Sequence, residues 1–183
     1  MTRRAMSRIA FALFCFAATL QAAALECRCD PSKPETMQAR ECSLCGEAEK
    51  HPLDVPHFIV KDINPRKPAR WLILPRKHYR SLDELPRKEY DALWTAAIAK
   101  SKELFGEQWG LAYNGDAVRT QCHGHIHIGR FLPAAEAGKP LVITKVSEIP
   151  RSRGKGMWIH GIPGGKMHVH YGEQICETAL ARY

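Results

Sequence analysis

The stretch Arg119-Thr120-Gln121-Cys122-His123-Gly124-His125-Ile126-His127-Ile128-Gly129-Arg130 carries three histidines at alternate positions. Successive side chains of a β-strand point to opposite faces, so a strand here would place all three imidazoles on one face. The two isoleucines between and after them would then enter the core from the other face. Three imidazoles on one face serve either metal binding or phosphate chemistry, and other parts of the sequence must separate these uses.

The chain has 183 residues, which suits one domain with extensions. Residues 1–24 predict a secretory signal peptide, because arginines precede an apolar run too short to span a membrane and small residues follow it. An uncleaved anchor helix is the alternative. We expect an irregular N-terminal arm over 25–41 and one domain over 42–183 that ends in a C-terminal extension. The signal peptide predicts a periplasmic or secreted protein.

The charge balance favours an anionic ligand. The formal net charge is +8, and it stays positive when the arginines of residues 1–24 are removed. The basic residues are scattered and do not alternate with aromatic residues, so we expect no nucleic-acid partner.

The cysteine count favours disulfides. Six cysteines follow the predicted signal peptide, and an even number in an exported chain is typical of disulfide bonding. The pairing stays open, and a bridge from Cys27 or Cys29 to Cys176 is one guess. The Cys-x-x-Cys pair at Cys42 and Cys45 suits metal ligands, half-cystines or, less readily, a redox pair.

The order of elements predicts an α+β domain, with an antiparallel sheet of about five strands packed against one main helix. The helix is expected over 86–105, where apolar residues recur at helical spacing between Pro86 and Gly106. Strands are expected over 58–63, 70–74, 109–114, 141–144 and near 158–165, besides the histidine stretch, and a short helix near 175–182.

Three motifs together resemble the histidine triad (HIT) superfamily over residues 42–130. The first is the histidine stretch, and the second is Cys42-x-x-Cys45. The third is the hairpin Asp62-Ile63-Asn64-Pro65-Arg66-Lys67-Pro68 with its closing Ile73-Leu74-Pro75-Arg76-Lys77-His78. Residues 119–128, with the later Trp158 and Pro163-Gly164-Gly165, also resemble the exported CDP-diacylglycerol pyrophosphatase branch. The resemblance implies a HIT-like fold and a nucleotide phosphoanhydride hydrolase.

The resemblance also implies roles for individual residues. His125 would be the nucleophile that forms a covalent nucleotidyl-histidine, and the carbonyl of His123 would hold its tautomer. His127 would donate to the phosphate, and Thr120 stands where the family often has a phosphate-binding serine. The residues expected to bind the nucleotide are Asp62, Ile63, Asn114 and Arg119.

A structural zinc is a further implication of the resemblance, with Cys42, Cys45, His78 and His123 as ligands. A disulfide is the competing use of the cysteines. The chemistry itself would need no cofactor. The expected partner is a nucleotide or a nucleotide-lipid substrate, which would allow peripheral membrane contact, and the family allows a homodimer.

Two other functions stay open. One is a zinc metallohydrolase that combines the histidine stretch with His168 or His170. The other is a non-enzymatic periplasmic metal-binding protein that uses Cys42, Cys45 and the histidine pairs. His160, His168 and His170 are otherwise expected to be surface or turn residues, or part of a substrate lid.

Overall fold

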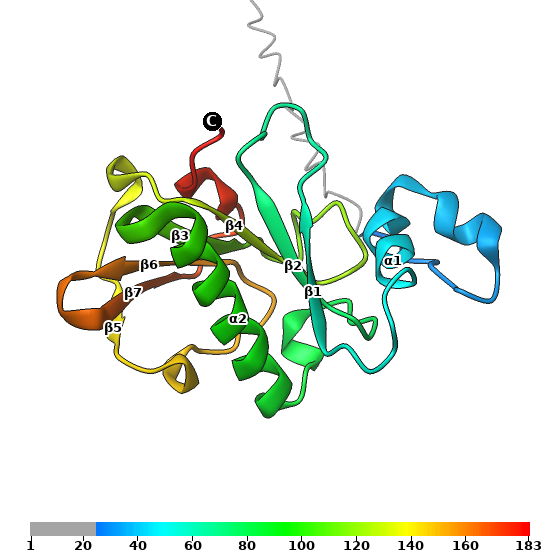
Figure 1. Ribbon diagram of the computed structural model, residues 1–183, viewed down its shortest axis with the longest axis horizontal. Coiled ribbons are helices and arrows are strands. Elements are labelled where there is room, and N and C mark those ends of the chain that lie inside the picture. Colours follow the sequence, from blue (N-terminus) through cyan, green and yellow to red (C-terminus); the bar gives the residue numbers. More distant parts are fainter. Residues whose placement is uncertain (1–24) are drawn as a thin grey trace, which may run out of the picture.

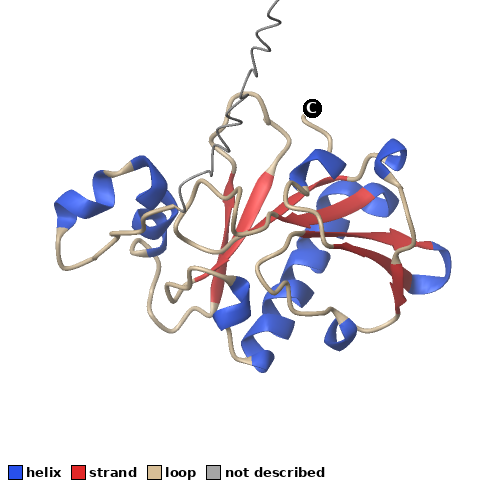
Figure 2. Cartoon of the chain, turned by 180° about the vertical axis from the view of Figure 1, so that it is seen from behind, coloured by secondary structure: helices blue, strands red, loops and turns tan. Residues whose placement is uncertain are grey.

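One antiparallel sheet of seven strands forms the frame of the protein (Figures 1 and 2). The computed structural model describes residues 25–183, so the predicted signal peptide lies outside the described residues. The spatial order is β1-β2-β4-β3-β6-β7-β5. The strands are β1 (His57–Lys61), β2 (Trp71–Pro75), β3 (Trp109–Tyr113), β4 (Ile126–Arg130), β5 (Leu141–Ile143), β6 (Met157–Ile162) and β7 (Lys166–Tyr171).

The predicted α+β class and antiparallel sheet are confirmed, but about five strands was too few. The hairpin of β6 and β7 accounts for the main difference, because no strand was expected over 166–171. Gly164 and Gly165 both have positive φ in the turn between these strands, a conformation that glycine adopts without steric cost. The chain therefore reverses sharply and returns as β7.

The main helix α2 (Arg87–Phe105) packs across one face of the sheet (Figure 1). Its buried side chains recur at helical spacing and meet the isoleucines of β4 in the core. Gly106, with φ 55°, ends the helix. The helix expected from the sequence is confirmed, with Pro86 as its N-cap residue.

The N-terminal arm is more ordered than predicted. It contains the 3-10 helices η1 (Pro34–Gln38) and η2 (Arg40–Cys42) and leads into α1 (Ser43–Ala48), beside the β1–β2 end of the sheet (Figure 1). Two disulfides tie it down, Cys27–Cys122 and Cys29–Cys42. The arm is therefore fixed against the loop that precedes β4.

The C-terminal segment covers part of the sheet face opposite α2. It contains η8 (Glu177–Ala179), so the helix expected near 175–182 is only one 3-10 turn. Gly110 and Gly129 make room for it, because a Cβ on either glycine would lie within 3.2 Å of Leu180. The segment thereby reaches β4.

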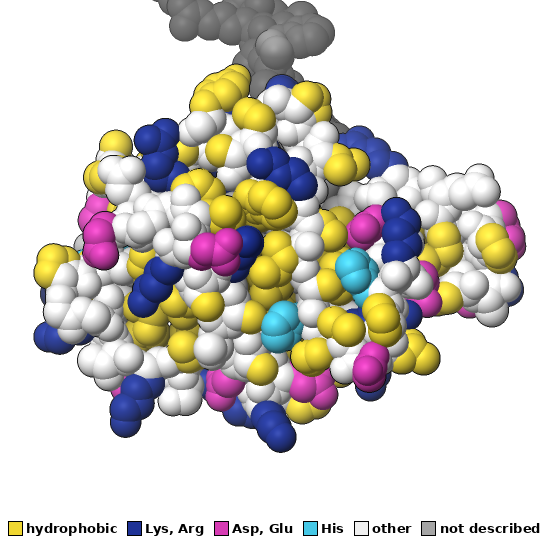
Figure 3. All heavy atoms as spheres, in the orientation of Figure 1, with side chains coloured by type: hydrophobic (Ala, Val, Ile, Leu, Met, Phe, Trp, Pro, Cys, Tyr) yellow, Lys and Arg dark blue, Asp and Glu magenta, His cyan; other side chains and the backbone are white. Residues whose placement is uncertain are grey.

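The remaining helical turns lie in connections: η3 (Leu82–Glu84), η4 (Gly106–Gln108), η5 (Pro133–Ala135), η6 (Val146–Glu148) and η7 (Pro163–Gly165). Within residues 25–183, no helix combines the length and apolar character needed to cross a membrane. On the face that bears α2, charged side chains of both signs are scattered among hydrophobic ones (Figure 3).

Candidate functional site

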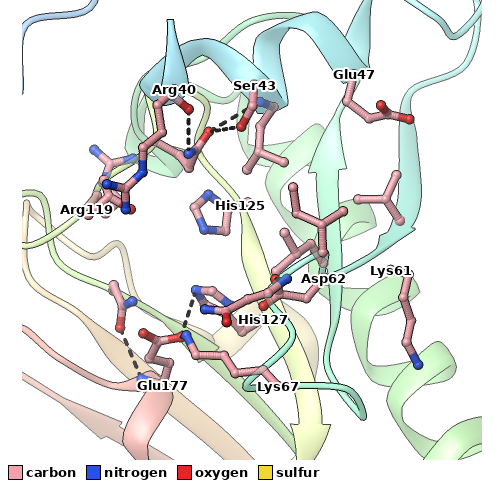
Figure 4. A pocket seen from close by; sticks show the side chains of 18 of the residues that line it. Arg40, Ser43, Glu47, Lys61, Asp62, Lys67, Arg119, His125, His127 and Glu177 are labelled. Carbon is pink, nitrogen blue, oxygen red and sulfur yellow. Dashed lines mark hydrogen bonds and ion pairs between the residues drawn. The ribbon is translucent and has the colours of Figure 1, made fainter. Parts of the chain in front are cut away.

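A cavity of about 810 Å³ lies beside the histidine stretch, between the N-terminal arm, the β1–β2 hairpin and the C-terminal segment (Figure 4). This volume is within the range of about 300–1,000 Å³ that small-molecule sites occupy. Its lining includes seven of the eight residues predicted for catalysis or nucleotide binding: Asp62, Ile63, Asn114, Arg119, Thr120, His125 and His127.

His125 lies in this pocket with its ring held by the backbone. Its Nδ1 is 2.8 Å from the carbonyl oxygen of His123, as the family resemblance predicted. A carbonyl only accepts, so Nδ1 carries the proton and Nε2 keeps its lone pair. The turn before β4 is anchored by Gly124, whose N–H donates to the carbonyl of Tyr79 at 2.7 Å. Burial lowers the pKa of His125, which favours the neutral ring.

His127 is the histidine that belongs to β4 itself, where it pairs with Leu72 of β2 and Ala112 of β3. Its ring centroid is 4.8 Å from that of His125. Within the described chain, neither ring nitrogen has a hydrogen-bond partner. Burial holds the pKa of His127 well below its usual value, so its ring is neutral. An unpartnered neutral imidazole is thus available to a ligand.

Glu177 is a pocket residue that sequence reasoning missed. Its Oε2 lies 2.5 Å from Nζ of Lys67, 3.4 Å from Nη1 of Arg70 and 3.7 Å from Nε2 of His127. The backbone N–H of Glu177 donates to Oδ1 of Asn114 at 3.1 Å, which fixes the start of η8. No local pattern signals this residue, because its position depends on packing of the distant C-terminal segment.

The other predicted residues are arranged around the two histidines (Figure 4). Asp62 accepts from the N–H of Asn64 at 2.9 Å through Oδ1, which leaves Oδ2 for a ligand. The side chain of Ile63 is 90% exposed. Arg119 donates to Asp116 at 2.7 Å and to the carbonyl of Arg80. Asn114 uses its oxygen to hold the C-terminal segment, so only its amide nitrogen remains for the predicted phosphate contact.

His123 does not share this face, which corrects the expectation for the histidine stretch. β4 begins at Ile126, so strand alternation does not govern His123 or His125. The Nε2 of His123 donates to the carbonyl of Pro75 at 2.9 Å, and its ring lies 5.1 Å from that of His78. The carbonyl of His123 therefore contacts His125 in the pocket, while its ring belongs to a different cluster of side chains.

That second cluster consists of Cys45, His78 and His123, whose ligand atoms lie within 4.8 Å of one another. Sγ of Cys45 is 3.4 Å from Nε2 of His78. The buried Nδ1 of His123 has no hydrogen-bond partner in residues 25–183. Burial raises the pKa of the Cys45 thiol to about 11, and a metal would have to displace that proton. One sulfur and two imidazoles supply three of the four ligands that a structural zinc ion normally takes.

The predicted fourth zinc ligand, Cys42, is not free, because it is bonded to Cys29. The Cys-x-x-Cys pair thus consists of one half-cystine and one thiol, and it is neither a redox pair nor an internal disulfide. The guessed bridge to Cys176 is also wrong, since Cys27 pairs with Cys122. Cys45 and Cys176 are the free, buried cysteines of the described chain.

His168 and His170 lie apart from the histidine stretch, which corrects the ligand set of the metallohydrolase hypothesis. The row of paired residues runs from His127 through Ala112 and Trp158 to His170. Three strand spacings, about 14 Å, separate its two ends. One metal ion cannot bind both.

A scan against protein-family models finds no match for the chain, and a search of curated proteins finds none either. The two disulfides fit an oxidising compartment.

Proposed function

We propose that the protein is an exported HIT-type hydrolase that cleaves a nucleotide phosphoanhydride through a covalent intermediate on His125. The observation that carries the proposal is the 2.8 Å hydrogen bond from Nδ1 of His125 to the carbonyl of His123. It assigns the lone pair of a neutral ring to Nε2, in a pocket large enough for a nucleotide. This is the state that a nucleophilic histidine requires.

In the first step, Nε2 of His125 attacks the phosphorus atom and the bond to the leaving phosphate oxygen breaks. The leaving phosphate takes the bonding electron pair, and the carbonyl of His123 stabilises the ring that now carries positive charge. In the second step, water attacks the same phosphorus. The P–N bond breaks, the electron pair returns to Nε2, and the attacking water releases one proton to the solvent.

The surroundings of His125 suit a phosphate chain. Lys67 and Arg119 supply positive charge, and His127 supplies a ring N–H for a phosphate oxygen. Glu177 pairs with Lys67, so a phosphate would compete with this carboxylate for the ammonium group. Asp62 offers a carboxylate oxygen to ribose hydroxyls, and exposed Ile63 offers an apolar surface to a base.

The metal has a structural role in this proposal. Zinc bound to Cys45, His78 and His123 would hold α1 and the end of the β1–β2 hairpin against the turn before His125. No step of the hydrolysis requires it.

The test is a substrate panel of CDP-diacylglycerol in detergent micelles and of dinucleoside polyphosphates. His125→Ala should lose activity by about 10³-fold or more, because the nucleophile is removed. The matched control is His57→Ala, at the start of β1 and outside the pocket lining. A nucleotidyl adduct on His125, trapped by rapid quench and found by mass spectrometry, would identify the intermediate. Equal turnover by wild type and His125→Ala would refute the assignment.

A chelator separates the remaining alternatives in the same assay. The proposal predicts turnover that persists when metal is removed at neutral pH. Activity that is lost on chelation and restored by metal would instead support a metallohydrolase. Tight stoichiometric metal with no turnover of any substrate would support a metal-binding protein.

A further inference from the structure

A second cluster of chemically active side chains lies on the β6–β7 hairpin, at the end of the sheet away from the N-terminal arm (Figure 1). It consists of His160 of β6, His168 and His170 of β7, and Glu136 from the loop after η5. One ligand atom from each residue lies within 4.8 Å of all the others. We propose that these four residues form a binding site for a divalent transition-metal ion, separate from the pocket of His125 and from the cluster of Cys45.

The sheet register brings the three imidazoles to one point. His168 and His170 are two residues apart on β7 and therefore share a face. His160 is the direct partner of His168 across the β6–β7 pair, and His170 is its diagonal neighbour. Glu136 approaches from the adjacent loop and contacts all three rings, at 2.5 Å from His160, 2.9 Å from His168 and 3.1 Å from His170.

Hydrogen bonding accounts for only part of the arrangement, because Nδ1 of His168 is hydrogen-bonded to Oε1 of Glu136 at 2.9 Å while Nε2 of the other two rings is not. Nε2 of His160 and Nε2 of His170 are buried and close to the carboxylate, yet neither has a hydrogen-bond partner with acceptable geometry in the described structure. Their side chains are only 6% and 4% exposed. Two buried ring nitrogens without aligned partners are costly in a folded protein. A cation placed between the four ligand atoms would satisfy both.

The rings are also held in place by their neighbours. His160 stacks on Phe131 with centroids 3.8 Å apart, and His170 stacks on Trp158 at 4.4 Å. Nδ1 of His160 donates to the carbonyl of Gly161 at 3.1 Å, which directs Nε2 toward the cluster. A backbone acceptor on the second ring nitrogen is characteristic of metal-binding histidines.

Three imidazoles and one carboxylate favour a borderline divalent ion such as Zn²⁺ over Mg²⁺ or Ca²⁺, which prefer oxygen ligands. The bound ion would clip the 133–138 loop to the β6–β7 hairpin. This inference is independent of the proposed hydrolase activity, because it concerns metal binding and local stability only.

The test uses the full mature chain with Cys45→Ser, which removes the thiol of the other metal cluster. After chelation and dialysis, the protein is titrated with Co²⁺ and with Zn²⁺ at micromolar concentration. We expect one equivalent to bind, with a visible Co²⁺ spectrum that lacks a thiolate charge-transfer band. Zn²⁺ should also raise the melting temperature.

Glu136→Gln and His168→Ala, each added to Cys45→Ser, should weaken metal binding by more than about 100-fold, which exceeds the usual effect of changing only a hydrogen-bond partner of a metal ligand. Both sites are partly exposed, so these variants should fold. His57→Ala is the matched control and should bind as before. The proposal is overturned if the Cys45→Ser protein binds no stoichiometric metal, or if folded Glu136→Gln and His168→Ala bind it equally well.

Discussion

The buried histidines beside the pocket make the stability of the protein depend on pH. Burial, with the nearby His78, lowers the pKa of His123 to about 3, and burial also lowers the pKa values of His125 and His127. In the unfolded chain these groups titrate near pH 6.5. Below that value the unfolded state binds more protons than the folded state, so the folded state loses stability as the pH falls.

We therefore expect full stabilisation from these histidines above about pH 6.5 and a progressive loss below it, toward the folded-state value near 3 for His123. Each histidine contributes at most about 1.4 kcal/mol per pH unit. Urea unfolding with a chelator present, at pH 7.5 and at pH 5.0, measures the difference. The free energy of unfolding of His123→Gln should depend less steeply on pH than that of the wild type. Equal free energies of unfolding at both pH values would contradict the prediction.

Arg70 is a buried residue that stabilises the fold by holding the C-terminal segment. Its side chain is 1% exposed, and its Nη2 donates to the carbonyls of Glu177, Leu180 and Ala181 at 3.1–3.3 Å. Arg70→Ala removes this donor and leaves the C-terminal carbonyls and the carboxylate of Glu177 without it. We expect a loss of about 3–5 kcal/mol in the free energy of unfolding.

Arg70→Lys is the matched control, since it keeps the charge but cannot reach several carbonyls with one planar group. Its free energy of unfolding, measured by chemical denaturation, should lie between those of the wild type and Arg70→Ala. A loss below about 1 kcal/mol for Arg70→Ala would show that the C-terminal segment holds its place without the guanidinium.

At the scale of elements, the close packing of η8 on the sheet decides where Glu177 lies. A Cβ at position 110 would lie 2.7 Å from Cδ2 of Leu180 and 3.0 Å from Cβ of Phe131. Gly110→Ala should therefore push the segment off β3 and cost about 1–3 kcal/mol by overpacking. Amide hydrogen exchange over residues 176–181 should speed up.

Gly46→Ala in α1 is the control for this change, because within residues 25–183 the added Cβ would meet, outside its own helix, only the carbonyl oxygen of Met37 at 3.9 Å. It should leave exchange in the C-terminal segment unchanged. Unaltered protection of residues 176–181 in Gly110→Ala would mean that the segment does not depend on this contact.

The elements that sequence reasoning predicted are those with a strong local signal. α2 carries a helical stripe of buried residues, and β1, β2 and β3 are rich in strand formers. β7 was missed because its histidines and flanking glycines weaken the strand signal. The common face expected for the three histidines was wrong for His123, because the strand begins three residues later.

The residues of the candidate site also fall into two groups, those with a local sequence signal and those positioned by long-range packing. Residues in compact motifs, such as Asp62, Thr120 and His125, line one pocket. Glu177 joins them only because the sheet accepts the C-terminal segment, and this depends on long-range packing. The pairing of Cys42 with Cys29 depends on how the arm folds back, which spacing alone does not reveal.

At the scale of the whole molecule, the two disulfides should contribute unequally to stability. The Cys27–Cys122 bond closes a loop of 95 residues, and the Cys29–Cys42 bond closes one of 13. By the chain-entropy relation, removing the long bridge should cost about 4–5 kcal/mol and removing the short bridge about 3 kcal/mol. Paired serine variants, compared by urea unfolding, measure both. A larger loss for the short bridge would contradict this ranking.

The Cys27–Cys122 bond also constrains the order in which the disulfides can form during synthesis. If the chain is exported from its N-terminus, as we propose, Cys27, Cys29, Cys42 and Cys45 meet the oxidant before Cys122 has emerged. Any disulfide that Cys27 forms in that interval is non-native, because its native partner is Cys122. Where such a bond has formed, thiol exchange must release Cys27 before it can pair with Cys122, which directly precedes His123. Under the proposed export, the yield of folded protein should therefore depend on a disulfide isomerase in the compartment that receives it.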